Sequence, residues 1–183
     1  MSPDAVTIAG TAGVILGGLI LYPLGHLWWG SVVVAFFAFS DVVDGIMARL
    51  QGNSGGWGNF LDSTLDRLAD GAIFAGLTIW FFTGGKDTSI GTAAVVCLVL
   101  GMVVSYARAK AESLGYKASV GIAERAERLA SVLLITGLTG LGLPRVVLFA
   151  TLVLLALASM VTVVQRMATV RKQAMAEAEG TGI

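Results

Sequence analysis

Long apolar stretches alternate along the chain with short polar or glycine- and proline-rich breaks. A helix needs about 20 mostly apolar residues to cross the hydrocarbon core of a bilayer. Six stretches have roughly this length, and they predict helical spans over about 5–24, 28–50, 59–82, 89–112, 122–141 and 144–169. The pattern therefore predicts an all-α, polytopic membrane protein with six transmembrane helices.

The basic residues are distributed unevenly between the two ends of these spans. Lys86 and Arg145 are the only cations in the loops after spans one, three and five, whereas most other Lys and Arg residues lie near the opposite ends. By the positive-inside rule those ends face the cytoplasm, and both termini do as well. We expect a transmembrane domain over residues 1–170, whose first span is retained, and a cytoplasmic tail over 171–183.

Composition agrees with a membrane protein, and it gives no sign of a nucleic-acid-binding or a disulfide-stabilised protein. Hydrophobic residues make up 56% of the 183 residues and charged residues only 13%, with a mean hydropathy of +0.83. Twelve Lys and Arg residues balance twelve Asp and Glu residues, so charge gives no reason to expect a nucleic-acid partner. The single cysteine, Cys97, cannot form an internal disulfide.

Carboxylates interrupt two of the apolar spans. Asp41 and Asp44 lie near the end of span two, and Asp62 and Asp66 near the start of span three. Each charge in a bilayer costs roughly 2.5–3.5 kcal/mol on insertion scales. Spacings of three and four residues place each pair on one helix face, and a short loop makes the helices antiparallel neighbours. Four carboxylates can thus converge, which suits Mg²⁺, Mn²⁺ or Ca²⁺. The alternative is interfacial acids paired with nearby arginines.

Small residues accompany the carboxylates. Gly45 and Gly58 lack side chains beside the acids, and Ala48 lies one helical turn from Asp44. A bulky ligand could therefore approach the backbone at this place.

The stretch from Asp41 to Asp66 resembles a known family signature. It reads Asp-Val-Val-Asp-Gly-Ile-Met-Ala-Arg, eight further residues, and Gly-Asn-Phe-Leu-Asp-Ser-Thr-Leu-Asp. This is similar to D-x-x-D-G-x-x-A-R-x8-G-x-x-x-D-x-x-x-D of the CDP-alcohol phosphatidyltransferases and matches it at every fixed position. The resemblance implies six transmembrane helices in a bacterial cell membrane, a site facing the cytoplasm, and a homodimer. The implied reaction transfers a phosphatidyl group from CDP-diacylglycerol to an alcohol and releases CMP.

The same resemblance implies roles for individual residues. Asp41, Asp44 and Asp62 would bind two Mg²⁺ or Mn²⁺ ions, and Asp66 would be the general base, a fourth ligand or both. The residues implied to contact the CDP-lipid are Gly45, Ala48, Arg49 and Gly58 from the signature, together with Asp4 and Thr7 at the start of span one.

The acceptor alcohol depends on three cations at the predicted cytoplasmic ends of spans four to six: Lys110, Arg128 and Arg166. Such a cluster suits a phosphorylated acceptor, although ordinary positive-inside charge would look similar. Residues 105–112, 124–128 and 164–166 are similar to actinobacterial members of the family that use inositol 1-phosphate. That acceptor would give phosphatidylinositol phosphate.

Two other functions remain open. Glycerol 3-phosphate is a rival acceptor because it is also a phosphorylated alcohol. A divalent cation transporter is a remote alternative that would explain the acids but not the small residues around them.

Asp70 lies one turn beyond Asp66, where it could support the site or pair with Arg67.

Overall fold

The computed structural model describes the backbone of residues 3–50, 56–122 and 124–180, and side chains within 5–39, 56–122 and 124–179. These residues form six α-helices, and the first continues as a short π-helix, η1. In chain order the elements are α1 (Pro3–Leu16), η1 (Gly17–Leu21), α2 (Leu27–Leu50), α3 (Gly56–Phe82), α4 (Thr88–Ser113), α5 (Arg125–Gly140) and α6 (Arg145–Gly180). No strand occurs in the described residues, which confirms the all-α prediction.

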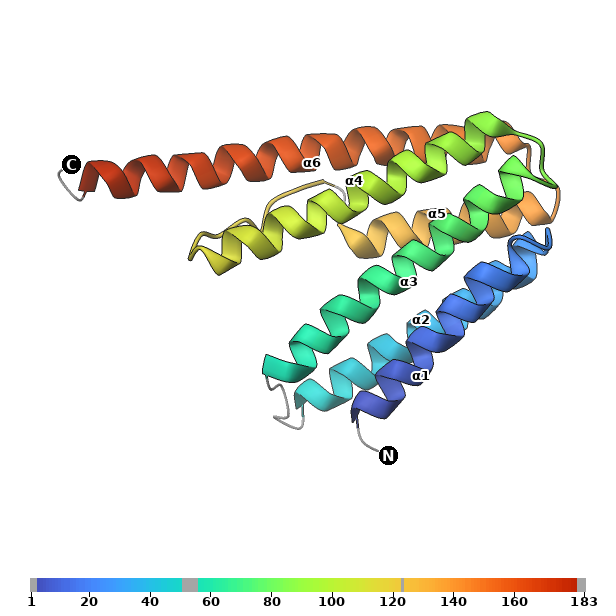
Figure 1. Ribbon diagram of the computed structural model, residues 1–183, viewed down its shortest axis with the longest axis horizontal. Coiled ribbons are helices and arrows are strands. Elements are labelled where there is room, and N and C mark those ends of the chain that lie inside the picture. The colour runs from blue at the N-terminus through green and yellow to red at the C-terminus, as the bar shows by residue number, and fades with distance from the viewer. Residues whose placement is uncertain (1–2, 51–55, 123, 181–183) are drawn as a thin grey trace.

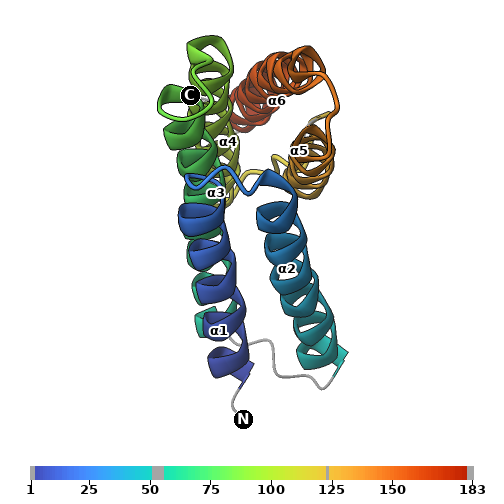
Figure 2. The same cartoon turned by 90° about the vertical axis from the view of Figure 1, so that its right-hand side faces the viewer.

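The helices pack as a closed ring in the order α1, α2, α5, α6, α4 and α3, with α3 returning to α1. The connections 22–26, 83–87 and 141–144 lie together at one end of the molecule (Figure 1). From that end α1, α2 and α3 lean away from α6, as both views show (Figures 1 and 2). Within the described chain α3 and α5 are not neighbours in the ring, so any contact between them crosses it.

Two described helices are long and apolar enough to cross a bilayer by themselves: Thr88–Ser113 and Arg145–Glu179. The stretches Ala5–Leu21 and Leu27–Phe39 are apolar but shorter. Helix α3 has the length, with 27 residues, but charged side chains occupy its first half. The helices also direct large apolar side chains outward, including Phe36, Val146 and Leu154, as expected for a lipid-facing surface.

Glycine allows α3 to approach the first helix closely. A Cβ at Gly76 of α3 would collide with the carbonyl oxygen of Gly18 in η1. A Cβ at Gly18 would in turn lie 3.1 Å from the Ala72 backbone. Gly13 similarly faces the ring of Phe37 on α2. The glycines of the first span therefore allow neighbouring helices to pack closely against it.

Helix α6 continues beyond the predicted end of span six near residue 169 and reaches Gly180. The predicted span follows apolar character and ends there, whereas the Ala-, Glu- and Lys-rich continuation of the helix has high helix propensity. No break in the helix marks the proposed domain boundary at residue 170. The cytoplasmic placement of residues 171–183 stays a prediction.

The connection between α4 and α5 lies along this long helix. Gln173 accepts a hydrogen bond from the Lys117 amide at 2.9 Å and donates one to the Lys117 carbonyl at 2.7 Å. Tyr116 donates to Glu177 at 3.0 Å. Nearer the start of α5, the Ile122 amide donates to Thr162 at 3.1 Å. These contacts fix the point at which the chain enters α5.

Candidate active site

Three acids form a row on one face of α3, because Asp62, Asp66 and Asp70 are spaced by four residues. Asp62 and Asp66 are half-buried, whereas Asp70 is only 2% exposed. A buried carboxylate requires compensating charge or hydrogen bonds. The row therefore predicts cationic partners on the facing helices.

The other two predicted acids are only partly placed. Asp41 and Asp44 belong to α2, whose backbone is helical to Leu50, but their side chains lie outside the described residues. Among the described side chains no group of three or more potential metal ligands comes together. The convergence of four carboxylates therefore stays a prediction. The donor chemistry of Asp62 and Asp66 fits a hard divalent cation, since both offer only oxygen.

Arg125 of α5 bridges two acids of the row. Its Nη1 lies 2.8 Å from Oδ1 of Asp66, and its Nε donates to Oδ1 of Asp70 at 3.1 Å. Arg67 of α3 is a further partner, at 3.9 Å from Asp66 and 3.5 Å from Asp70, and it donates to the Ser105 hydroxyl of α4. Asp70 thus pairs with Arg67, one of the two roles that the sequence suggested, and with α5 as well.

Arg128 of α5 is buried, with 1% of its surface exposed. Its Nη2 donates to Oδ2 of Asp70 at 3.3 Å. Its Nε and Nη1 have no hydrogen-bond partner within the part of the chain that the structure describes. The guanidinium fits beside α4 because residue 101 is glycine, where a Cβ would lie 2.8 Å from Cζ of Arg128.

The local sequence of α5 explains why both arginines face the acids. The amide of Glu124 donates to the Glu127 carboxylate at 3.2 Å, as in a capping box, and this fixes the helix start at Arg125. Arg125 and Arg128 are three residues apart and therefore share a face. The sequence interpretation assigned no site role to Arg125 or Gly101. The three-residue spacing was a signal for Arg125, but no signal identified Gly101.

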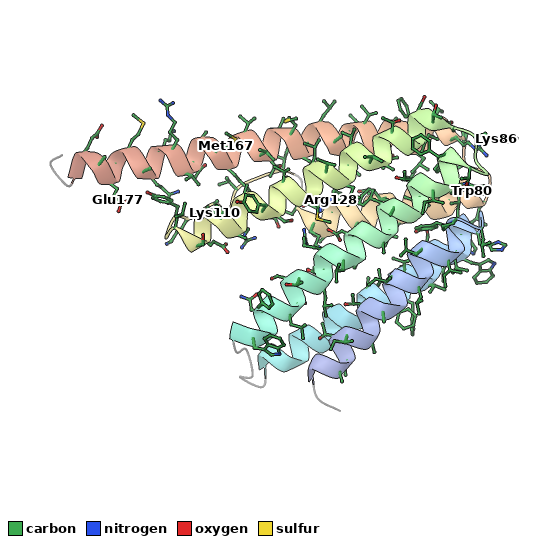
Figure 3. All side chains as sticks on the ribbon, in the orientation of Figure 1. Trp80, Lys86, Lys110, Arg128, Met167 and Glu177 are labelled. Carbon is green, nitrogen blue, oxygen red and sulfur yellow. The ribbon has the colours of Figure 1, made fainter. Side chains whose placement is uncertain are left out.

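The other two predicted acceptor cations have different surroundings. Arg166 is 3% exposed and donates to the carbonyls of Val104 at 2.6 Å and Val120 at 2.9 Å. Lys110 is exposed in the last turn of α4. Figure 3 shows it well away from Arg128, which lies on α5. Of the three cations, Arg128 is the one that pairs with the acid row. Their joint role as phosphate ligands stays a prediction.

The predicted CDP-lipid residues lie on the first three helices. Thr7 is half-buried on α1, and Gly58 is in the first turn of α3, where a Cβ would meet no atom of the described residues within 4 Å. The side chains of the remaining members fall outside the described residues: Asp4 on α1, and Gly45, Ala48 and Arg49 on α2. Open space at Gly58 agrees with the expected approach of a ligand to the backbone.

Similar proteins are found by both sequence and structure. The family model described as CDP-alcohol phosphatidyltransferase matches residues 1–168. The phosphatidylinositol phosphate synthase of Streptomyces avermitilis is 49% identical, over 98% of this chain and 75% of that protein. The protein of the same name from Mycolicibacterium smegmatis is 48% identical, over 93% of this chain and 78% of the relative.

Solved structures give the same result. The crystal structure of Mycobacterium tuberculosis phosphatidylinositol phosphate synthase with CDP-DAG bound has a TM-score of 0.87 at 41% identity, covering 93% of this chain and 86% of that one. The same synthase in complex with manganese and citrate also has a TM-score of 0.87, with 82% of that chain covered. The match spans nearly the whole chain in sequence and in fold, and it includes the α3 acid row. The chain belongs to the CDP-alcohol phosphatidyltransferase family and is a transferase of that class.

Proposed function

We propose that this enzyme transfers the phosphatidyl group of CDP-diacylglycerol to inositol 1-phosphate, giving phosphatidylinositol phosphate and CMP. The observation that carries the proposal is 49% identity along 98% of the chain to a protein named phosphatidylinositol phosphate synthase. The solved relative with CDP-DAG bound supports the donor. Buried Arg128, with two nitrogens unpartnered among the described residues, supports a phosphorylated acceptor.

The reaction requires one bond to form and one to break. The acceptor hydroxyl oxygen attacks the phosphorus that carries the diacylglycerol, and the bond from this phosphorus to the CMP oxygen breaks. The hydroxyl proton passes to a carboxylate. We assign this step to Asp66, because it lies in the middle of the acid row and is only half-buried, so that substrate can reach it.

The acids Asp41, Asp44, Asp62 and Asp66 are proposed to hold two Mg²⁺ or Mn²⁺ ions. Bound divalent cations neutralise the pyrophosphate oxygens and stabilise the departing CMP. The manganese complex of the solved relative supports this class of metal. The signature residues of α2, with Gly58, Thr7 and Asp4, are proposed to bind the nucleotide and the adjoining lipid phosphate.

The acceptor phosphate is proposed to bind beside Arg128, with Lys110 and Arg166 adding positive charge. Arg128 is held on one side by Asp70 and directs its other donors elsewhere, which suits bidentate binding of a phosphate. Arg166 is already engaged by two carbonyls, so we expect it to shape the wall of the pocket as well as its charge.

We further propose six membrane crossings in a bacterial cell membrane, with both termini and the site facing the cytoplasm, and a homodimeric assembly. The apolar outward faces of α4 and α6 support membrane insertion. Charged residues gathered in the first half of α3 and the first turns of α5 support a site near one membrane surface, since water can reach them there.

The proposed function is tested by measuring CMP release from CDP-diacylglycerol with three acceptors offered in parallel. Inositol 1-phosphate should support rapid turnover, and free inositol and glycerol 3-phosphate should not. Preference for glycerol 3-phosphate would instead identify a phosphatidylglycerol phosphate synthase. Divalent metal flux into vesicles without CMP release would identify a transporter.

A further inference from the structure

Asp70 has more ionic partners than any other described acid. Its carboxylate lies 3.1 Å from Nε of Arg125, 3.3 Å from Nη2 of Arg128 and 3.5 Å from Nη1 of Arg67. It is buried, and it lies one helical turn further along α3 than Asp66. At this position it neither reaches solvent nor belongs to the family signature.

The contacts of Asp70 cross the helix ring. Two of its partners belong to α5, which is not a ring neighbour of α3 in the described chain. The third, Arg67, extends to Ser105 on α4. Asp70 therefore joins the helix that carries the acid row to the helix that carries the acceptor arginine.

The contacts of Arg128 leave two of its guanidinium nitrogens available for a ligand. Asp70 receives one donor, from Nη2, while Nε and Nη1 have no partner among the described residues. Gly101 confines the guanidinium from the α4 side. An arginine fixed at one nitrogen and confined at its carbon keeps a defined orientation, with its remaining donors ready for a ligand.

We propose that Asp70 is a positioning residue that sets the orientation of Arg128 for the acceptor phosphate. This proposal rests on the proposed function, because it assumes that Arg128 contacts the acceptor. A purely structural role would require only a negative charge near three buried or half-buried cations. Positioning requires the carboxylate to lie at a particular place.

Asp70→Glu separates the two roles, because it keeps the charge and moves the carboxylate by one methylene. Positioning predicts that KM for inositol 1-phosphate rises on the order of tenfold, since a misplacement of about 1 Å can cost as much or more. KM for CDP-diacylglycerol and the midpoint of thermal unfolding in detergent should stay near the wild-type values. A charge-only role predicts wild-type values for all three measurements.

A comparison of two further variants covers the case in which Asp70→Glu does not fold. Arg128→Gln and the double variant Asp70→Asn/Arg128→Gln remove charge without leaving Arg128 as an unpaired buried cation. If Asp70 acts through Arg128, the double variant should have the acceptor KM of Arg128→Gln alone. Asp87→Ala serves as the stability control, because Asp87 caps α4 far from the acids by accepting from the Ile90 amide at 3.2 Å.

Three results would overturn the proposal: an unchanged acceptor KM in folded Asp70→Glu, an equal rise in the donor KM, or an acceptor KM in the double variant that is higher than in Arg128→Gln alone. Loss of stability in Asp87→Ala should leave both KM values unchanged, which separates unfolding from positioning. If wild-type enzyme uses glycerol 3-phosphate instead, the proposed function fails. The same variants then test the positioning role with that acceptor.

Discussion

At the scale of single residues, the buried charged groups differ in how many of their polar atoms have a partner within the described chain. Asp70 has three cationic partners, whereas Arg128 has a partner in the described chain for only one of its nitrogens. A buried donor without a partner costs roughly 1–3 kcal/mol, so a ligand that supplies the partner recovers this energy on binding. Arg128, whose remaining nitrogens have no partner in the described chain, is therefore the residue expected to discriminate between acceptors.

Arg128 and Arg166 should respond differently to truncation. Arg128→Ala should raise the acceptor KM at least tenfold, with little change in the donor KM, because a charge-assisted hydrogen bond to phosphate is worth about 1.5–3 kcal/mol. Arg166→Ala should also lower the thermal unfolding midpoint, since its guanidinium joins α6 to the carbonyls of Val104 and Val120. Steady-state kinetics with each substrate varied, and unfolding in detergent, check both expectations. A larger rise in the donor KM would contradict the acceptor assignment.

Gly101→Ala tests the packing of Arg128 without touching a charge. The added Cβ would lie 2.8 Å from Cζ of Arg128, so the guanidinium must move. We expect the acceptor KM to rise several-fold while the donor KM holds, because the displaced guanidinium no longer has the orientation proposed for binding the acceptor phosphate. Gly71→Ala is the matched control, because among the described residues its Cβ would meet only Met102, at 3.9 Å. Equal effects of the two substitutions would show that Gly101 has no special role.

At the scale of helices, the length of the apolar stretches predicted where the helices lie in the sequence, but it did not predict which helices contact one another. The six predicted apolar stretches correspond in position to α1–α6. Among the described residues, two of these helices, Thr88–Ser113 and Arg145–Glu179, are long and apolar enough to cross a bilayer. Helix α6 extends past the predicted end of span six, since a helix can continue after its apolar character stops. The acids of α3 could be predicted from a motif. Their partners on α5 could not, because spacing along one helix does not reveal which helix lies across the ring.

The close contact between η1 and α3 gives a prediction about stability. Gly76→Ala should lower the free energy of unfolding by about 1–3 kcal/mol or more, because the new Cβ would collide with the Gly18 carbonyl oxygen and neither backbone can yield easily. Thermal unfolding in detergent measures this loss. Gly71→Ala on the same helix should be neutral or slightly stabilising. An unfolding midpoint for Gly76→Ala as high as that of the control would contradict the observed helix approach.

At the scale of the whole molecule, the ring gives the two halves of the chain separate tasks. Helices α1 to α3 carry the family signature and the proposed donor site, and α4 to α6 carry the cations proposed for the acceptor. The residues proposed for the donor and for the acceptor therefore lie on different helices, apart from Asp70 of α3, which contacts Arg128 of α5. This explains how the signature can identify the family without identifying the alcohol.

Removal of metal should abolish turnover without unfolding the ring. In excess EDTA, CMP release should fall to background and return when Mg²⁺ or Mn²⁺ is added, because the acids of α2 and α3 are proposed to hold the cations that neutralise the pyrophosphate. The thermal unfolding midpoint should change little, since the buried contacts of Asp70 are made by arginines. Full turnover in EDTA would exclude a metal-dependent mechanism.

The pairing of Asp70 across the ring also affects the order in which the chain can fold during synthesis. Arg125 follows Asp70 by 55 residues and Arg128 by 58. At about 5–20 residues per second, the ribosome needs roughly 3 to 11 seconds to make this interval. During that time Arg67, three residues before Asp70, is the one cation of the three that has already been made. Arg67 is therefore the one of the three arginines with which Asp70 can pair before α5 is made, and the contacts that cross the ring can form only afterwards.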